Sequence, residues 1–309
     1  MKKQFLLCAL LGSLVQPLPA AAAGPKEFSF GVISPPLKAA DESALREAIE
    51  QTDGDNLAFV VVNGLKADDE LCSDKLYNDR KAVLDASKHP LVVSLAASDW
   101  ATCKGENGKS SAFGRLSRLR ELFFADEFPA AAGKIAVVRQ SAMVKFRSYP
   151  ENARWETGNL MFATLNLPSN NNHYVTDAGR NSEFEDRLIA NRDWLHRVYI
   201  YAARKKLAGV VLFCDGDPLA PPAGNSSMRD GFAETRRYLT SLAAKYPGKT
   251  LVIHNARATG PGMKPGIHWH RNLGELALPP GAFRLVVHPS SPALFAVANS
   301  RVQASNQHQ

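Results

Sequence analysis

Two apolar runs decide the fold class of this chain. Residues 57–62 have the sequence LAFVVV, and residues 90–95 have the sequence PLVVSL. Continuous apolar runs of this length predict strands that are buried on both faces, as in parallel sheets. A third strand is predicted at residues 28–33, and helices are predicted at residues 41–51, 74–87 and 110–124. This βαβαβα order predicts an α/β fold with a parallel sheet wound by helices.

The second half of the chain continues the alternation. Ser182 followed by Glu185 fits a capping box at the start of a long helix, and Gly209 is typical of a helix stop. We predict helices at residues 182–207 and 228–246, strands at 135–138, 160–165, 210–213 and 250–254, and an antiparallel pair at 283–287 and 293–298. Because no segment has the composition of a linker, residues 24–299 are predicted to form a single domain, and residues 300–309 a flexible tail.

The first 23 residues have the pattern of a secretory signal peptide. Two lysines precede an apolar stretch at residues 5–15, and four alanines at residues 20–23 provide a cleavage site. The alternative is a membrane anchor, but the apolar stretch is short for a spanning helix. We therefore expect export to the periplasm or the medium, with no stable membrane insertion.

Composition excludes several classes of protein. Of 309 residues, 45% are hydrophobic and 22% are charged, which is typical of a globular chain and not of a disordered one. The net charge of +7 is spread along the sequence, and the one tight basic cluster, at residues 204–206, lies at a predicted helix end. No basic stripe with interleaved aromatics exists, so nucleic acid is not an expected partner.

Three cysteines remain after the predicted leader. Cys72 and Cys103 each follow a predicted strand by about ten residues, and parallel neighbouring strands would bring them to the same sheet edge. In an oxidising compartment we expect a Cys72–Cys103 disulfide. Cys214 ends a buried strand and is predicted to be an inert core thiol.

Open α/β sheets bind ligands beyond the carboxyl ends of their strands. Polar side chains follow several predicted strands, and a long loop at residues 168–181 contains three consecutive asparagines. Loops of this length in a compact domain are usually functional or mobile. The predicted ligand-binding residues are Asn63, Asp99, Trp100, Asn166, Asn171, Asn172, Asp215 and His254.

Several motifs follow one another in a distinctive order. They are Cys72-Ser73-Asp74 through Asp79-Arg80, His89-Pro90, Trp100, Cys103, Arg118-Leu119-Arg120-Glu121, the segment from Tyr149 to Trp155, the loop from Asn166 to Asn172, and Glu183, Arg187 and Trp194. This order resembles the calcineurin-like metallophosphoesterases, and most closely an exported bacterial branch. The resemblance covers about residues 28–298, and it implies a one-domain, four-layer αββα sandwich of two mixed sheets.

The metal motifs of that family are replaced in this chain. The Asp-x-His motif has Pro35 and Leu37 at its positions, and the Gly-Asp motif has Gly64-Leu65, so the bridging carboxylate is missing. Ser98 replaces the ligand asparagine, and the late Gly-His-x-His motif reads Asn255-Ala256-Arg257-Ala258, so both of its histidines are missing. Two divalent cations held close together need negative charge between them. We therefore expect a pseudoenzyme with no metal cofactor, whose cleft binds an unknown small ligand or protein.

An active metal-dependent phosphoester hydrolase with a rebuilt site is the alternative. Asp99 and His254 would then be the catalytic candidates. Mn, Fe or Zn would suit a carboxylate and imidazole site, for which the candidate ligands are Asp215, Asp217, His268 and His270. Surface or structural histidines and an aspartate–glycine turn at residues 215–218 are the simpler interpretation of the same residues.

Overall fold

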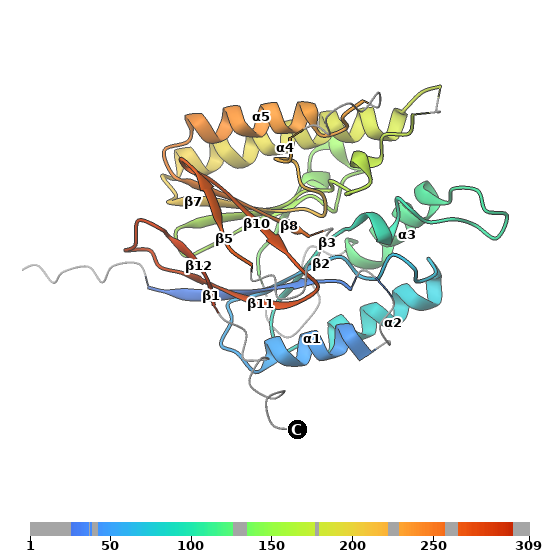
Figure 1. Ribbon diagram of the computed structural model, residues 1–309, viewed down its shortest axis with the longest axis horizontal. Coiled ribbons are helices and arrows are strands. Elements are labelled where there is room, and N and C mark those ends of the chain that lie inside the picture. Colours follow the sequence, from blue (N-terminus) through green and yellow to red (C-terminus); the bar gives the residue numbers. More distant parts are fainter. Residues whose placement is uncertain are drawn as a thin grey trace, which may run out of the picture.

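The computed structural model has two mixed β-sheets and several helices (Figure 1), which confirms the predicted α/β class. It describes residues 26–36, 38, 43–125, 135–176, 179–221, 229–256 and 265–298. The predicted leader at residues 1–23 and the predicted tail at residues 300–309 lie outside these ranges. So do Leu37 and Ala258, two of the positions where the metal motifs are replaced.

The first sheet has five strands in the order β12-β11-β1-β2-β3. β1 lies at its centre, parallel to β2 and antiparallel to β11. β11 and β12 form the predicted antiparallel pair. The bounds are β1 Phe28–Ser34, β2 Val60–Asn63, β3 Leu91–Ser94, β11 Gly281–Val287 and β12 Phe295–Ala298.

The second sheet has seven strands in the order β4-β5-β6-β7-β8-β10-β9. Its central strands β6, β7, β8 and β10 are parallel, and antiparallel strands flank them. Three of its strands, β5, β9 and β10, were not predicted from the sequence. The bounds are β4 Val138–Arg139, β5 Ala153–Thr157, β6 Leu160–Thr164, β7 Gly209–Phe213, β8 Lys249–Asn255, β9 His268–His270 and β10 Leu273–Leu278.

Aromatic side chains from both sheets fill the space between them. The ring of Phe162 lies 4.8 Å from that of Phe59 and 5.3 Å from that of Phe30, in edge-to-face contacts. Trp155 stacks on Phe162 and Phe213. Each buried aromatic side chain removes a large apolar area from water, so this cluster fixes the two sheets face to face.

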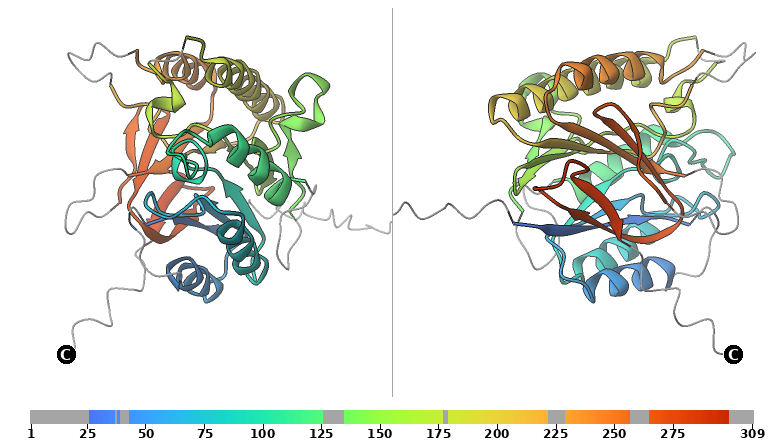
Figure 2. Two further views of the ribbon diagram at one scale, coloured as in Figure 1. Left: turned by 90° about the vertical axis from the view of Figure 1, so that its right-hand side faces the viewer. Right: turned by 60° about the vertical axis from the view of Figure 1, so that its left-hand side comes forward.

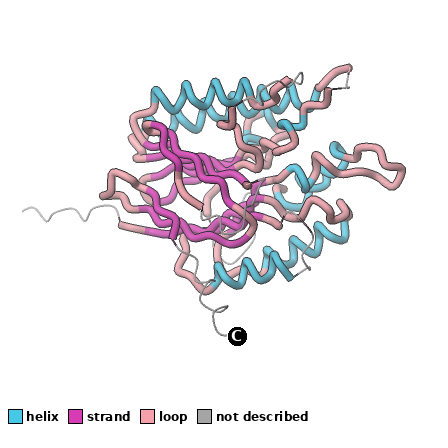
Figure 3. The backbone as a smooth tube through the Cα atoms, viewed as in Figure 1, coloured by secondary structure: helices cyan, strands magenta, loops and turns pink. Residues whose placement is uncertain are grey.

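Helices cover the two outer faces, as Figures 1, 2 and 3 show. Helices α1 and α2 pack on the five-stranded sheet, with α3 against α2, while α4 and α5 pack on the seven-stranded sheet. The bounds are α1 Ser43–Asp53, α2 Asp74–Asp85, α3 Ala112–Phe123, α4 Ser182–Arg204 and α5 Ala233–Lys245. Within the described residues, no helix has the length and apolar character required to cross a membrane.

Both ends of α4 differ from the sequence prediction. Asn181, not Ser182, precedes the helix, and no capping box forms, because the Asn181 side chain instead bonds to the backbone of Val175. At the other end, Gly209 already belongs to β7. Lys206 adopts the left-handed conformation, with φ of 56°, and the amides of Lys206 and Leu207 bond to the carbonyls of Ala203 and Ala202. This is a Schellman stop with a lysine where glycine is preferred.

We therefore expect Lys206→Gly to stabilise the protein by about 1 kcal/mol, since glycine adopts this conformation without a steric penalty. Urea unfolding measures the effect. Lys205→Gly is the matched control, because Lys205 is right-handed with φ of −78°, and glycine there should cost about 0.5–1 kcal/mol. Equal destabilisation by Lys206→Gly and Lys205→Gly would contradict the Schellman stop at Lys206.

Candidate functional site

The carboxyl ends of strands from both sheets meet in a buried hydrogen-bond network. Ser34 ends β1, Asn63 ends β2 and Asn255 ends β8. The Ser34 hydroxyl donates to Asn255 Oδ1 at 2.8 Å, and Asn63 Nδ2 donates to the same oxygen at 3.1 Å and to the Cys214 carbonyl at 2.7 Å. The polar groups at this edge therefore bind one another across the two sheets.

Asp215 connects this network to two loops. Its Oδ1 accepts a hydrogen bond from Asn255 Nδ2 at 2.9 Å, and its Oδ2 accepts from the backbone amides of Ala97 at 2.7 Å and Ser169 at 2.9 Å. The carboxylate is 2% exposed. Asp215 thus fixes the backbone of loops that follow β3 and β6, because each amide is bonded to the same rigid group.

The Asp99 carboxylate likewise accepts hydrogen bonds from backbone amides of two loops. It lies in the 3-10 turn η1, Ala97–Asp99, and its two oxygens accept from the amides of Leu65 and Ala96 at 2.9 and 2.7 Å. Burial raises the pKa of Asp99 to about 7, although the two amide hydrogen bonds and nearby Lys66 oppose the shift. Burial also lowers the pKa of Lys66, against the attraction of Asp99.

Gly64 lets three strand ends approach closely. Its φ is +119°, and a Cβ atom there would lie 2.7 Å from Pro35 Cγ and 2.9 Å from Ala96 Cβ. Only glycine combines this backbone conformation with such close neighbours. The loops after β1, β2 and β3 are therefore packed against each other, with no room for a side chain between them.

An open cleft lies outside this packed layer. Its volume is about 680 Å³. The walls come from the loops after β2, β3 and β6, and the Cys72–Cys103 disulfide forms part of one wall. The lining residues are Lys66, Asp68, Asp69, Glu70, Leu71, Cys72, Thr102, Cys103, Lys104, Ser169 and Asn170.

The predicted Cys72–Cys103 disulfide is confirmed, and Cys214 is a buried free thiol whose pKa burial raises well above its usual value. The bridge spans 31 residues of sequence. Replacing both cysteines with alanine should lower the free energy of unfolding by about 3 kcal/mol, because the unfolded chain regains loop entropy.

Urea unfolding with and without reductant measures the contribution of the disulfide. Reductant should destabilise the wild-type protein and leave the double variant unchanged. A wild-type protein that is equally stable in reductant would contradict the prediction.

The asparagine loop forms a left-handed turn. Asn171, Asn172 and His173 have φ values of 53°, 54° and 54°, a conformation that asparagine tolerates better than most residues. Asn171 Oδ1 accepts from the amide of Gly231 at 2.8 Å. Arg187 donates to the carbonyl of Asn172 at 2.8 Å and to its side-chain oxygen. The loop is thus fixed from the side of α4 and from the segment before α5.

Arg187 is the centre of a buried cluster under this loop. It is 0% exposed, and its Nε donates to Glu183 at 2.6 Å. Burial would raise the pKa of Glu183, but the charge of Arg187 and hydrogen bonds from His173 and Arg187 lower it to about 2. Arg187 also donates to the carbonyl of Asn166, a buried residue whose side chain bonds to Glu151.

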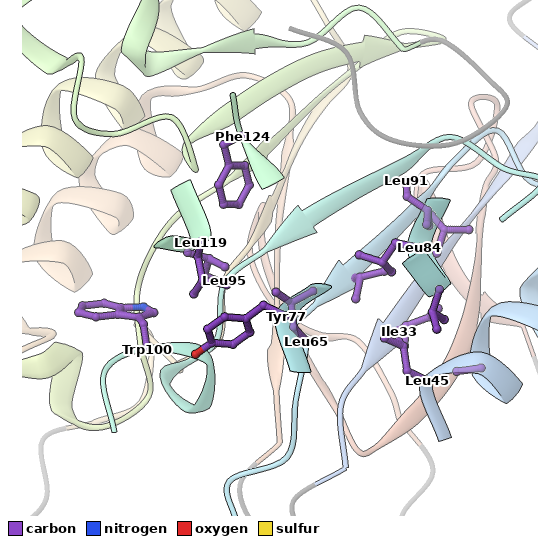
Figure 4. Close-up of a cluster of buried hydrophobic side chains, with 14 of the residues drawn as sticks. Ile33, Leu45, Leu65, Tyr77, Leu84, Leu91, Leu95, Trp100, Leu119 and Phe124 are labelled. Atoms are coloured by element: carbon purple, nitrogen blue, oxygen red, sulfur yellow. The ribbon is translucent and has the colours of Figure 1, made fainter. Parts of the chain in front are cut away.

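Trp100, one of the predicted ligand-binding residues, is not among the residues that line the cleft described above. The indole is 0% exposed and belongs to the core beneath the first sheet, near Tyr77 (Figure 4). It contacts the ring of His173 at 4.8 Å, and the guanidinium of Arg187 lies 5.6 Å from its centre. Its role is to support the asparagine loop from below.

A second group of polar side chains lies at the same strand ends but on the outer face of the seven-stranded sheet. His254 Nε2 lies 3.2 Å from Glu275 Oε1 and 3.9 Å from Asp217 Oδ1. Of the metal candidates from the sequence, Asp217 belongs to this group, whereas Asp215 belongs to the network between the sheets. His268 and His270 are exposed on β9, where His268 pairs with Glu275 in the register.

The sequence prediction missed Glu275 because β10 was not predicted. The segment LGELAL at residues 273–278 alternates in burial and could have been detected as a half-buried strand. It also missed the role of Arg187, for which helical spacing from Glu183 was the available signal.

No protein-family model matches this sequence, and a search of curated proteins finds no significant match.

Proposed function

We propose that this protein is an exported, metallophosphoesterase-like binding protein, whose cleft beside the disulfide takes up a ligand and whose strand-end centre performs no phosphoester hydrolysis. One observation carries the proposal. The strand-end side chains of Ser34, Asn63 and Asn255 bond to one another and to backbone carbonyls across the two sheets. Of their side-chain polar atoms, Asn63 Oδ1 is the one to which the described residues donate no hydrogen bond. Groups used in this way hold the scaffold and do not hold a reacting centre.

The residues at the strand ends do not fit a dinuclear metal centre. Pro35 and Leu65 have no donor side chain, and the Ser98 hydroxyl donates to the Lys66 carbonyl at 2.9 Å. The oxygens of Asp99 and Asp215 accept from backbone amides and from Asn255. Two adjacent cations need a bridging carboxylate and several further donors, and these positions do not supply them.

The side chains that line the cleft favour a polar ligand with one positively and one negatively charged group. Asp68, Asp69 and Glu70 line it together with Lys66 and Lys104. Lys66 is buried and its Nζ donates to the Ala67 carbonyl, and Glu70 pairs with Arg80, so the exposed charges of the lining are Asp68, Asp69 and Lys104. Ser169 and Asn170, from the loop after β6, add polar side chains to the lining. Such a lining binds zwitterions better than large apolar molecules, since few apolar side chains face the space.

Hydrolysis assays test the absence of catalysis. The chain without residues 1–23 is incubated with Mn²⁺ or Zn²⁺ and with bis(p-nitrophenyl) phosphate or p-nitrophenyl phosphate. We expect no turnover above the metal-only background. Turnover that is lost in Asp99→Asn or Asp215→Asn would contradict the proposal and support the rebuilt hydrolase.

Thermal-shift measurements test the cleft. A panel of amino acids, amines and organic phosphates is screened, and stabilisation by a zwitterionic member is expected, because a ligand that binds only the folded state raises its melting temperature. Asp69→Asn and Lys104→Gln should reduce the shift. Asp79→Asn, on an exposed face of α2, is the control that should retain it.

A further inference from the structure

His254 and its neighbour Asn255 point to opposite sides of the seven-stranded sheet. Ile253 packs between the two sheets, and Val252 packs against the layer formed by α4 and α5. Because side chains alternate along a strand, His254 lies on the helix side and Asn255 lies between the sheets. The surroundings of His254 are therefore separate from the strand-end network.

Three donors from neighbouring segments converge there. Asp217 lies in the loop after β7, His254 near the end of β8, and Glu275 on β10, and β8 pairs with both β7 and β10. One donor atom of each lies within 4.8 Å of the other two. Among the described residues, no other three His, Cys, Asp or Glu side chains come together in this way.

Two of the three donors are oriented by a second side-chain contact, and the third, Glu275, has its backbone held in a paired strand. His254 Nδ1 lies 3.1 Å from the Asn255 carbonyl, so a proton on Nδ1 leaves the lone pair of Nε2 directed at the two carboxylates. Asp217 Oδ1 accepts from the amides of Leu219 and Ala220 at 2.7 and 2.9 Å. Glu275 is fixed by its place in a paired strand. Orientation of this kind is typical of metal ligands.

The separations are compatible with a small cation, and the 3.2 Å between His254 Nε2 and Glu275 Oε1 is also that of a hydrogen bond. Ligands about 2.1 Å from a tetrahedral or octahedral ion lie about 3.0–3.4 Å from one another, close to the 3.2 Å between His254 and Glu275. The 3.9 Å to Asp217 is too long for a hydrogen bond. A neutral imidazole and two carboxylates carry a charge of −2, which a divalent ion neutralises.

We propose that Asp217, His254 and Glu275 bind one divalent transition-metal ion, such as Zn²⁺, at the edge of the outer face of the seven-stranded sheet. Imidazole and carboxylate donors suit ions of this class. The side chains of Asp217 and Glu275 are 26% and 33% exposed, so water can complete the coordination. The proposal is independent of the proposed function, because it uses neither the cleft nor the network between the sheets.

The site is tested by Zn²⁺ titration of the untagged chain without residues 1–23, after a chelator has removed any bound metal. Competition with a chromophoric chelator measures stoichiometry and affinity. One equivalent should bind to the wild-type protein, and His254→Ala and Glu275→Gln should each lower the affinity about tenfold or more. Zn²⁺ should raise the melting temperature of the wild-type protein and not that of Glu275→Gln.

Two controls separate this site from adventitious binding. Glu27→Gln removes the partner of the exposed His288, a histidine–glutamate pair with a distance of 2.6 Å, and His270→Ala removes one exposed histidine of β9. Both should bind Zn²⁺ as the wild-type protein does. The proposal would be overturned if the wild-type protein bound no Zn²⁺. It would also be overturned if Glu275→Gln retained Zn²⁺ binding while His270→Ala abolished it. Because Glu275 is partly exposed, its variant tests the site even if His254→Ala does not fold.

Discussion

Arg187→Met is expected to lower the free energy of unfolding by about 3–5 kcal/mol, the usual cost of removing one partner of a buried ion pair. Methionine has a similar length but leaves Glu183, whose side chain is 11% exposed, without its main counter-charge. The carbonyls of Asn166 and Asn172 also lose their donor. Urea unfolding at neutral pH measures the loss.

A matched control exists on the same helix. Arg197 pairs with Asp193 at the same four-residue spacing, but its side chain is 51% exposed. Arg197→Met should therefore cost less than about 0.5 kcal/mol. If the two variants were equally stable, the buried cluster would not hold the asparagine loop.

The pH dependence gives the same prediction a second test. The folded pKa of Glu183, about 2, lies below its ordinary value of 4.5, so its ionised form stabilises the fold above about pH 4.5, and this stabilisation is lost as pH falls towards 2. Arg187→Met removes most of this contribution. The stability difference between wild type and variant should therefore shrink between about pH 5 and pH 2.

Asp215→Ala is the second change with a large expected effect, again about 3–5 kcal/mol. It removes the common acceptor of Ala97, Ser169 and Asn255. A buried donor left without an acceptor costs about 1–3 kcal/mol, and Asp215→Ala removes an acceptor from three buried donors. Urea unfolding measures the total loss in the free energy of unfolding.

Amide hydrogen exchange locates the effect. Exchange at Ala97 and Ser169 should accelerate more than at amides in the middle of β7, since the two loops lose their shared anchor. Asp79→Ala, an exposed helix residue, is the control and should leave both amides protected. Uniform acceleration in every strand would show that Asp215 has no particular role in holding the loops.

The elements that the sequence predicted best are those buried on both faces. The runs at residues 57–62 and 90–95 appear as β2 and β3, because a continuous apolar run has few other stable environments. β10 was missed because LGELAL gives only a short alternating pattern, a weaker signal than a continuous apolar run, and its burial also depends on residues far away in the sequence.

The candidate site was harder to predict, since a polar residue after a strand can face a ligand or another loop. Asn63 and Asp99 are 0% exposed, and their side chains bond to partners far away in the sequence, Cys214 and Asn255 for Asn63 and Leu65 for Asp99. Local sequence contains no signal for these partners. Conversely, the Cys72–Cys103 pair was predictable, because neighbouring parallel strands alone bring the two loops together.

The pairing of β1 with β11 also bears on how the chain acquires its fold. Phe28 lies opposite Val287, so the central strand of the five-stranded sheet gains one of its two neighbours from the far end of the sequence. Contacts of such long sequence separation form slowly. During synthesis, or in a chain truncated before residue 281, β1 would be an exposed edge strand able to pair with other chains. Aggregation of such truncated chains would therefore follow from the strand order as well as from the loss of the core residues Leu285, Val287, Leu294 and Phe295.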